Sequence, residues 1–194
     1  QSLTGIAAMI SSILFFVFWL ILRKPVKTRF VLLVLAIAIL SVPFIYVSHV
    51  IVRFYDFEKV NEQSIDRYTS KGNPYSHDFD NPMVENGYFV YLYVCEPELR
   101  EEWNKISTFK YDSLGPNGFP VYSTLLRYMT SKGLRKDAEG IQALNKQDIR
   151  NIEKGIANIV YQKKRFSLYP RIYQTIWEYH VYSHSGYANN QSLS

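Results

Sequence analysis

The sequence has few of the residues that build common functional sites. Its single cysteine, Cys95, excludes an internal disulfide framework, and we expect its thiol to be buried and inert. Cysteines and carboxylates do not accompany its four histidines, His49, His77, His180 and His184, at the spacing of a zinc or iron site. Although His180 and His184 would share a helix face, a third ligand is missing, so we expect no metal and no other cofactor.

Acidic residues are absent from the first 52 positions, which carry four basic side chains. Residues 53–194 carry 18 basic and 17 acidic side chains, so the net charge of +5 comes mostly from the N-terminal segment. Nucleic-acid binding would need a basic stripe on the C-terminal part, and the charge balance provides none. We therefore do not expect nucleic acid as a partner.

Charge of either sign is absent from two long apolar runs, Leu3–Leu22 with 20 residues and Phe30–Val52 with 23. An apolar helix of about 20 residues rises roughly 30 Å, which is the thickness of a bilayer core. Residues 1–52 are therefore predicted to form a transmembrane helical hairpin. A pair of buried helices in a soluble protein is the alternative, but uncharged runs of this length are rare in soluble cores.

The turn between the two runs collects four basic residues within positions 23–29. Short cytoplasmic loops are enriched in lysine and arginine, so this turn is predicted to face the cytoplasm. Residues 53–194 are then predicted to be periplasmic, in a multi-pass protein of the bacterial inner membrane. The chain begins within an apolar run and ends in the polar stretch GYANNQSLS, so we expect a fragment of a longer membrane protein.

The fold class predicted for the whole chain is mainly α, with at most one or two short strands in the extracytoplasmic domain. Residues 52–68 contain a candidate short amphipathic helix, and residues 69–82, rich in Gly, Pro, Asn and Asp, are expected to be irregular. The aromatic and β-branched run YFVYLYVC at 88–95 favours a buried strand. A short buried helix remains the alternative there, because periodicity does not separate the two.

Four further helices are predicted from apolar stripes at helical spacing. They cover residues 96–106, 120–133, 145–160 and 169–182. Gly133 supplies a stop for the second, and Asn145 with Asp148 resembles a capping pair at the start of the third. The chain also contains 16 tyrosines and 12 phenylalanines, which suit either core packing or stacking against the faces of sugars.

Five basic residues are candidate substrate-binding residues. Arg53 is the first charge after the second apolar run, and it suits either a simple interfacial anchor or a clamp for a lipid diphosphate. Lys132 complements the dipole of a helix C-terminus, whereas Arg135 and Lys136 lie beyond the helix stop and are candidates for phosphate or acidic sugar. Arg171 stands in the first turn of a helix, where the dipole disfavours a cation, and this favours a specific partner.

The basic cluster Lys163, Lys164 and Arg165 is interpreted as a solvated loop.

Two long segments carry a resemblance to a known family. They are STLLRYMTSKGLRKDAEGIQALNKQDIRNIEKGIAN at 123–158 and SLYPRIYQTIWEYHVYSHSGYANNQSLS at 167–194. Together with NGYFVYLYVCEPELREEWNKIS at 86–107 and the preceding hairpin, they resemble the large periplasmic loop of bacterial O-antigen ligase family proteins. The resemblance extends over nearly the whole chain.

The resemblance implies a polytopic inner-membrane glycosyltransferase. Such an enzyme takes a glycan from an undecaprenyl-diphosphate-linked carrier and transfers it to lipid A-core, in a ligase, or to another carrier-linked glycan, in a polymerase. It also implies that arginines near the outer membrane face hold the diphosphate, and Arg53 matches one of these. The family's histidine motif is expected beyond Ser194, so His180 and His184 are not assigned its role.

A membrane-anchored periplasmic sensor or assembly protein, whose exterior domain only binds, is the alternative function. Partners expected from the preferred interpretation are the carrier-linked glycan, its lipid A-core or glycan acceptor, and membrane lipids. The catalytic residues are not identified by the sequence.

Overall fold

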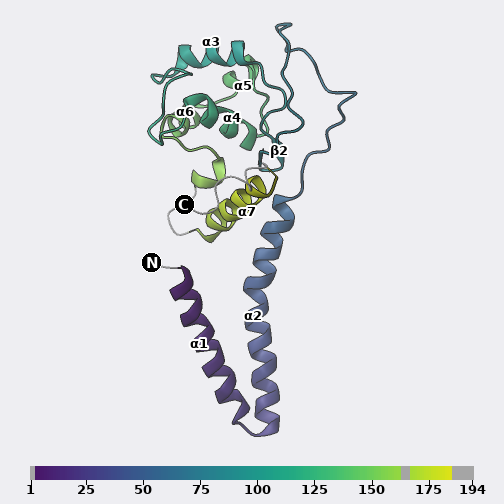
Figure 1. The fold of residues 1–194 in the computed structure, drawn as a ribbon, viewed down its shortest axis with the longest axis vertical. Helices are drawn as coiled ribbons and strands as arrows, with labels where there is room; N and C mark the ends of the chain where they lie inside the picture. The colour runs from purple at the N-terminus through teal and green to yellow at the C-terminus, as the bar shows by residue number, and fades with distance from the viewer. Residues whose placement is uncertain (1–2, 163–166, 185–194) are drawn as a thin grey trace. The chain divides into compact units, whose positions relative to one another are not determined.

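A computed structural model describes residues 3–162 and 167–184 of the chain (Figure 1). The chain forms two compact units, Gln1–His49 and Val50–Ser194. The described residues are mainly helical with two short strands, so the predicted fold class is confirmed at that level.

The first unit contains α1, Leu3–Leu22, and most of α2, Val26–Phe54, joined by a short turn. Backbone bonds from Arg23 N to Leu20 O (3.3 Å) and from Lys24 N to Ile21 O (3.1 Å) close this turn. Of the described helices, α2 is long and apolar enough to cross a membrane, and α1 contributes a shorter apolar stretch, Ser11–Leu22.

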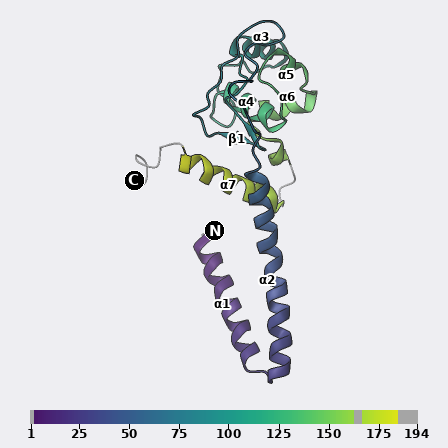
Figure 2. The same ribbon diagram turned by 90° about the vertical axis from the view of Figure 1, so that its right-hand side faces the viewer.

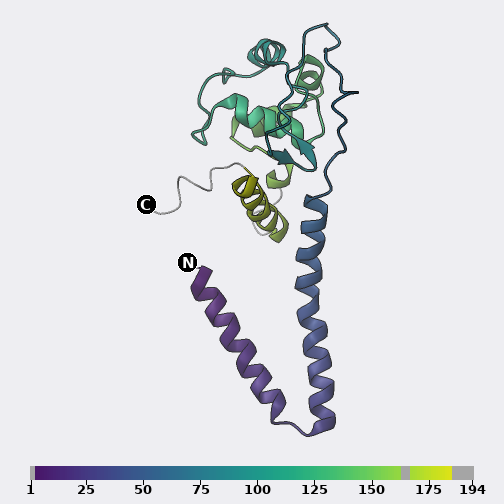
Figure 3. The same ribbon diagram turned by 45° about the vertical axis from the view of Figure 1, so that its right-hand side comes forward.

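The second unit is organised around α4, Val121–Ser131, which Figure 3 shows in the interior of this unit. Eight of its eleven residues are buried, because it packs against other elements on most of its surface. The remaining helices of this unit are α3, Glu96–Ile106; α5, Ala138–Gln142; α6, Lys146–Glu153; the 3₁₀ turn η1, Ile159–Gln162; and α7, Leu168–His184. Trp103, Leu125 and Met129 lie at the centre of the core, and each is fully buried.

The start of α6 confirms the predicted capping pair. The Asn145 side chain accepts bonds from the backbone of Gln147 and Asp148, and the Asp148 side chain accepts one from the Asn145 backbone. This reciprocal arrangement satisfies N–H groups that the first helical turn leaves without partners. Gly133 follows the C-cap of α4 with φ +68°, in the left-handed conformation that the helix stop requires.

The strand predicted for residues 88–95 is wrong over most of its length, and so is the alternative short helix. Only Tyr88–Phe89 forms a strand, β2, which pairs antiparallel with β1, Val84–Glu85. Asn86 (φ +51°) and Gly87 (φ +90°) form the tight turn between them. A Cβ at Gly87 would approach Asp56 O to 2.7 Å, so this turn also needs glycine for space.

Two helix predictions also need correction. The helix expected over 145–160 ends at Glu153, and Gly155 (φ +79°) turns the chain before η1 begins. Residues 55–68 contain no helix, because α2 ends at Phe54 and the chain continues without regular structure. The sequence interpretation missed α5, whose N-cap Asp137 accepts a bond from Gly140 N (2.8 Å).

Helix α7 lies beside the β1–β2 hairpin and the last turn of α2, below the cluster of α3 to α6 in Figures 1 and 2. The Phe54 ring meets Tyr173 at 5.3 Å and His180 at 5.6 Å between centroids. Trp177 Nε1 donates to Val84 O (2.8 Å), and the Tyr173 hydroxyl accepts from Asn86 N (2.8 Å). These contacts hold α7 against the segment that precedes the core.

Candidate functional site

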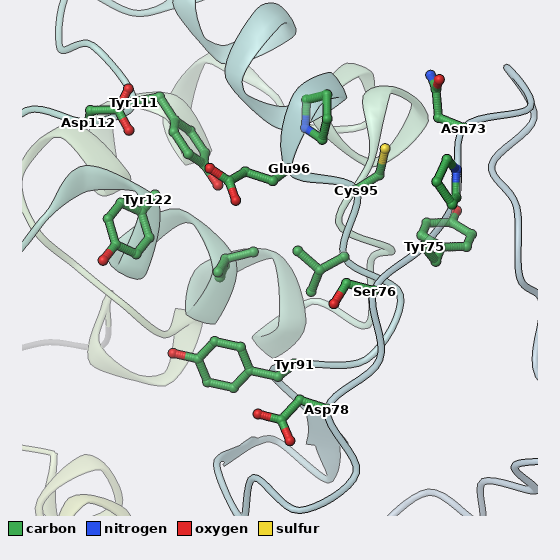
Figure 4. Close-up of a pocket in the computed structure, with 14 residues that line it drawn as sticks. Asn73, Tyr75, Ser76, Asp78, Tyr91, Cys95, Glu96, Tyr111, Asp112 and Tyr122 are labelled. Atoms are coloured by element: carbon green, nitrogen blue, oxygen red, sulfur yellow. The ribbon is translucent and has the colours of Figure 1, made fainter.

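One hollow of the second unit has a volume of about 690 Å³ and four tyrosines in its wall. We call it the tyrosine pocket, and Figure 4 shows its lining side chains. The polar and aromatic residues that line it are Asn73, Tyr75, Ser76, Asp78, Tyr91, Glu96, Tyr111, Asp112 and Tyr122. Its volume falls in the range of roughly 300–1,000 Å³ that is typical of small-molecule sites.

Backbone hydrogen bonds between distant segments build the walls of the tyrosine pocket. Ser76 and Val94 exchange two bonds (2.8 and 3.1 Å), and Asp78 N donates to Tyr91 O (2.9 Å). On the opposite side, Tyr122 N donates to Tyr111 O (3.1 Å), and the two rings lie 5.7 Å apart. The pocket therefore forms only when the loop before β1 and the start of α4 are both in place.

Carboxylates surround the tyrosines, and an arginine partly compensates them. The Arg100 guanidinium bonds to both Glu96 and Asp112, and it lies 4.9 Å from the centre of the Tyr111 ring. Asp78 takes part in none of the ion pairs found among residues 3–162 and 167–184. Of the three carboxylates that line the pocket, Asp78 is thus the one without an ion-pair partner among the described residues.

Tyrosine hydroxyls supply the other polar groups of the pocket. Burial raises the pKa of Tyr91 and of Tyr111, so both hydroxyls remain protonated at neutral pH and can donate as well as accept. Tyr75 is already engaged, because its hydroxyl donates to Asp137. The pocket thus combines aromatic faces with donors and acceptors, which is the combination that a polyhydroxylated ring needs.

The tyrosine pocket has no activated nucleophile among its described lining residues. Cys95 is buried with 1% of its surface exposed, and burial raises the pKa of its thiol. A thiol in that environment stays protonated and unreactive, as the sequence predicts. The tyrosine pocket is therefore suited to binding and orienting a ligand.

Lys132 and Arg135, two of the predicted substrate-binding residues, form ion pairs inside the second unit. Lys132 Nζ lies 2.6 Å from Asp148 Oδ2, beside the capping pair of α6. Arg135 pairs with Asp66, and its guanidinium lies 4.8 Å from the centre of the Tyr93 ring. Both cations therefore help to hold loops in place.

Lys136 lies in a different environment, since it is 3% exposed and belongs to none of the ion pairs of the described residues. Its Nζ donates to Phe89 O (3.2 Å), and it lines a small cavity of about 200 Å³ together with Glu58, Tyr88 and Tyr93. Burial lowers the pKa of Lys136 to about 8, although the charges of Glu58 and Asp137 act in the opposite direction. The charged form of such a lysine carries a free-energy cost, because burial removes the water around its ammonium group.

The low pKa of Lys136 predicts a specific dependence of stability on pH. In the unfolded chain its pKa returns to 10.5, so between pH 8 and 10.5 the unfolded state binds more protons and folding stability rises with pH. Relative to Lys136→Met, the free energy of unfolding of the wild type should rise by about 1.5 kcal/mol from pH 8 to pH 9.5. Denaturant titrations of the wild type and of Lys136→Met at both pH values measure this free energy of unfolding. A difference that stays constant with pH would contradict the lowered pKa.

Arg53 and Arg171 have exposed side chains at the ends of two helices that contact each other. Arg53 is in the last turn of α2 and Arg171 in the first turn of α7, and the nearby rings of Phe54 and Tyr173 meet edge to face. Neither arginine belongs to an ion pair among the residues that the structure describes. The basic cluster Lys163, Lys164 and Arg165 lies outside the described residues.

The five predicted residues therefore have different surroundings: two form ion pairs, one is buried and two are exposed. The structure also contains the tyrosine pocket, which was not predicted from the sequence. The tyrosines of that pocket come from positions 75 to 122, and no local spacing links them. The high tyrosine content of the sequence was consistent with such a pocket, but composition does not predict which tyrosine rings lie close together.

Comparisons of this chain with protein-family models, with curated proteins and with solved structures find no match.

Proposed function

We propose that this chain is the membrane-anchoring and glycan-binding part of an inner-membrane glycosyltransferase of the O-antigen ligase or polymerase type. The tyrosine pocket is the observation that carries the proposal, because its aromatic faces, hydroxyls and Asp78 carboxylate suit a sugar ring. The reaction transfers a glycan from undecaprenyl diphosphate to lipid A-core or to a second glycan.

Exposed apolar surface supports the membrane location. Large apolar side chains along α1 and α2 are open to the surroundings, for example Phe15 at 73% and Phe44 at 74% exposure. Exposed apolar surface of this extent marks an interface with lipid or with another protein. With the basic turn at 23–29 in the cytoplasm, one crossing of the membrane by α2 brings residues 53–194 to the periplasm.

The proposed roles follow from charge and position. A diphosphate leaving group gains negative charge as the sugar departs, and guanidinium groups neutralise it through paired hydrogen bonds. Arg53 is the best placed, at the end of the apolar run, and Arg171 starts the helix that packs beside it. The glycan then extends into the periplasmic domain, where the tyrosine pocket binds it.

A membrane-anchored sensor or assembly protein is the second candidate, and two observations favour it. The second unit has its own core, and side chains cap the starts of α5 and α6, as expected for a self-sufficient binding domain. Lys132 and Arg135 are also engaged in internal ion pairs. In this function the tyrosine pocket binds glycan without transferring it.

Substitution of Tyr122, which is 39% exposed in the tyrosine pocket, is expected to weaken glycan binding. Loss of one stacking contact in Tyr122→Ala should cost about 1 kcal/mol, roughly fivefold in affinity. The measurement is calorimetry with the chain in lipid nanodiscs and with oligosaccharides released from the cell's own surface polysaccharide. Tyr179→Ala, a tyrosine 66% exposed on α7, is the matched control and should bind normally.

The two candidate functions differ in cells that carry Tyr122→Ala. A transferase loses glycan attached to its acceptor in parallel with binding, whereas a sensor or assembly protein leaves the attachment reaction itself intact. Failure of the wild-type chain to bind any of the oligosaccharides would refute both.

A further inference from the structure

A second hollow of about 650 Å³ lies beside α7. Its wall is formed by Asp78 and residues 80–83 on one side and by Trp177, Glu178, Val181, Tyr182 and His184 on the other. We call it the α7 hollow. Its volume is close to that of the tyrosine pocket, and it also offers aromatic rings together with carboxylates.

The two hollows meet at one residue, because Asp78 lines both of them. Asp78 N donates to Tyr91 O (2.9 Å), which fixes this residue to the wall of the tyrosine pocket. Asp80 and Asn81 follow it closely in the chain and line the α7 hollow. The two hollows are therefore neighbours, with Asp78 in the wall of both.

Hydrogen bonds fix the two walls of the α7 hollow to each other. Trp177 Nε1 donates to Val84 O (2.8 Å), and His180 Nε2 bonds to Pro82 O (2.9 Å). Both bonds connect α7 with the segment that carries Asp78 and Asp80. The hollow is thus held open by structure on both sides, and a ligand meets a prearranged surface.

The described lysines and arginines line neither hollow, although Arg100 pairs with two carboxylates of the tyrosine pocket. Asp78, Asp80 and Glu178 line the α7 hollow. A uronic acid or a phosphate would meet uncompensated carboxylates there, whereas neutral sugar hydroxyls would donate to them. This charge pattern selects against acidic glycans.

The aromatic side chains of the α7 hollow differ in their availability. Arg127 stacks on the Trp177 ring at 4.1 Å, so one face of this ring is covered. Tyr182 has 52% of its surface exposed and contributes the accessible ring. Tyr182 is therefore the residue on which a sugar unit in this hollow would stack.

We infer that the tyrosine pocket and the α7 hollow are two subsites of one groove for an extended, uncharged glycan, with Asp78 between them. This inference rests on the proposed glycan-binding function and adds the length and charge class of the ligand. Because each hollow has the volume of a complete small-molecule site, the groove takes several sugar units at once.

The test uses the whole chain in nanodiscs and oligosaccharides of one to eight repeat units, released from the cell's surface polysaccharide and separated by size. Wild-type affinity is expected to rise at least tenfold from the shortest to the longest. Tyr182→Ala should reduce this gain about fivefold and leave the shortest oligosaccharide bound as before, while Tyr179→Ala keeps the wild-type profile. Oxidation of the primary hydroxyls to carboxylates should weaken binding of the long oligosaccharides.

Equal affinity for all lengths, or an equal loss for short and long oligosaccharides in Tyr182→Ala, would overturn the two-subsite groove while glycan binding itself stands. Tighter binding of the oxidised oligosaccharides would overturn the charge class. Absence of binding at every length in the wild type would instead overturn the proposed function on which the groove depends.

Discussion

Replacement of Arg127 by methionine is expected to lower the free energy of unfolding by about 3–5 kcal/mol, because it leaves a buried carboxylate without its cation. Arg127 Nε donates to Glu85 Oε1 (2.6 Å), and Glu85 has no exposed surface. After the substitution, Asn158 would be the remaining side chain bonded to that carboxylate. Burial already raises the pKa of Glu85 against the opposing effect of Arg127, so the carboxyl should take up a proton in the variant.

The measurement is urea unfolding of wild type, Arg127→Met and the double variant Arg127→Met/Glu85→Leu. The double variant should recover much of the lost stability, since apolar residues often replace a buried ion pair at little cost. Lys105, an exposed lysine that pairs with Glu101 and Glu102, provides the control. Lys105→Met should change the free energy of unfolding only slightly, because solvent screens these pairs and Glu102 keeps its bond to Lys71. A loss for Arg127→Met as small as that for Lys105→Met would contradict the role of the buried pair.

The same ion pair connects stability with the proposed groove. Arg127 belongs to α4, Glu85 to β1, and the Arg127 guanidinium stacks on Trp177 of α7 at 4.1 Å. Three elements that are distant in the sequence therefore meet at one guanidinium. Loss of this contact is expected to loosen α7 as well as the core, since Trp177 lines the α7 hollow.

Helices were predictable where local chemistry decides them. Residues 96–106 and 120–133 carry an apolar stripe with proline at the start, and α3 and α4 lie within these bounds. The Asn145–Asp148 capping pair marks the start of α6 because its hydrogen bonds involve only neighbouring residues. Signals of this kind need no knowledge of the rest of the fold.

The errors occur where a local pattern suits more than one structure. Aromatic residues at 88–95 favour a strand, but Val90 and Leu92 pack into the core from irregular backbone. The Asn86–Gly87 pair was a readable signal for the tight hairpin that ends the strand after two residues. Gly155 was likewise a readable stop for α6.

For the candidate site, too, residue types can be read from the sequence, whereas contacts between distant segments cannot. Basic residues stand out in a sequence, yet Lys132 and Arg135 have partners at Asp148 and Asp66, which sequence alone does not assign. The tyrosine pocket was not predictable, because its rings are brought together by backbone bonds between loops. Arg53 keeps its predicted role as a proposal, since its position relative to the apolar run follows from the sequence directly.

Substitution of Arg53 by lysine is expected to slow glycan attachment about a hundredfold, through the loss of roughly 3 kcal/mol of stabilisation of the leaving diphosphate. Arg53 lies in the last turn of α2 with an exposed side chain, and it takes part in no ion pair of the described residues, so its guanidinium is available to a ligand. Lysine keeps the charge and reaches the membrane surface equally well. It lacks the planar fork that bonds two phosphate oxygens at once.

The experiment measures glycan attached to the acceptor in cells that depend on this protein, at matched expression of wild type, Arg53→Lys and Arg150→Lys. Arg150 is an exposed arginine on α6 that bonds to Gln147, so its variant controls for a general effect of exchanging arginine for lysine. Any cation interacts favourably with the dipole at a helix C-terminus. A residue that only anchors α2 at the membrane interface would therefore tolerate replacement by lysine. Near-normal attachment in Arg53→Lys would therefore assign Arg53 to anchoring, and the diphosphate would have to be bound by other residues.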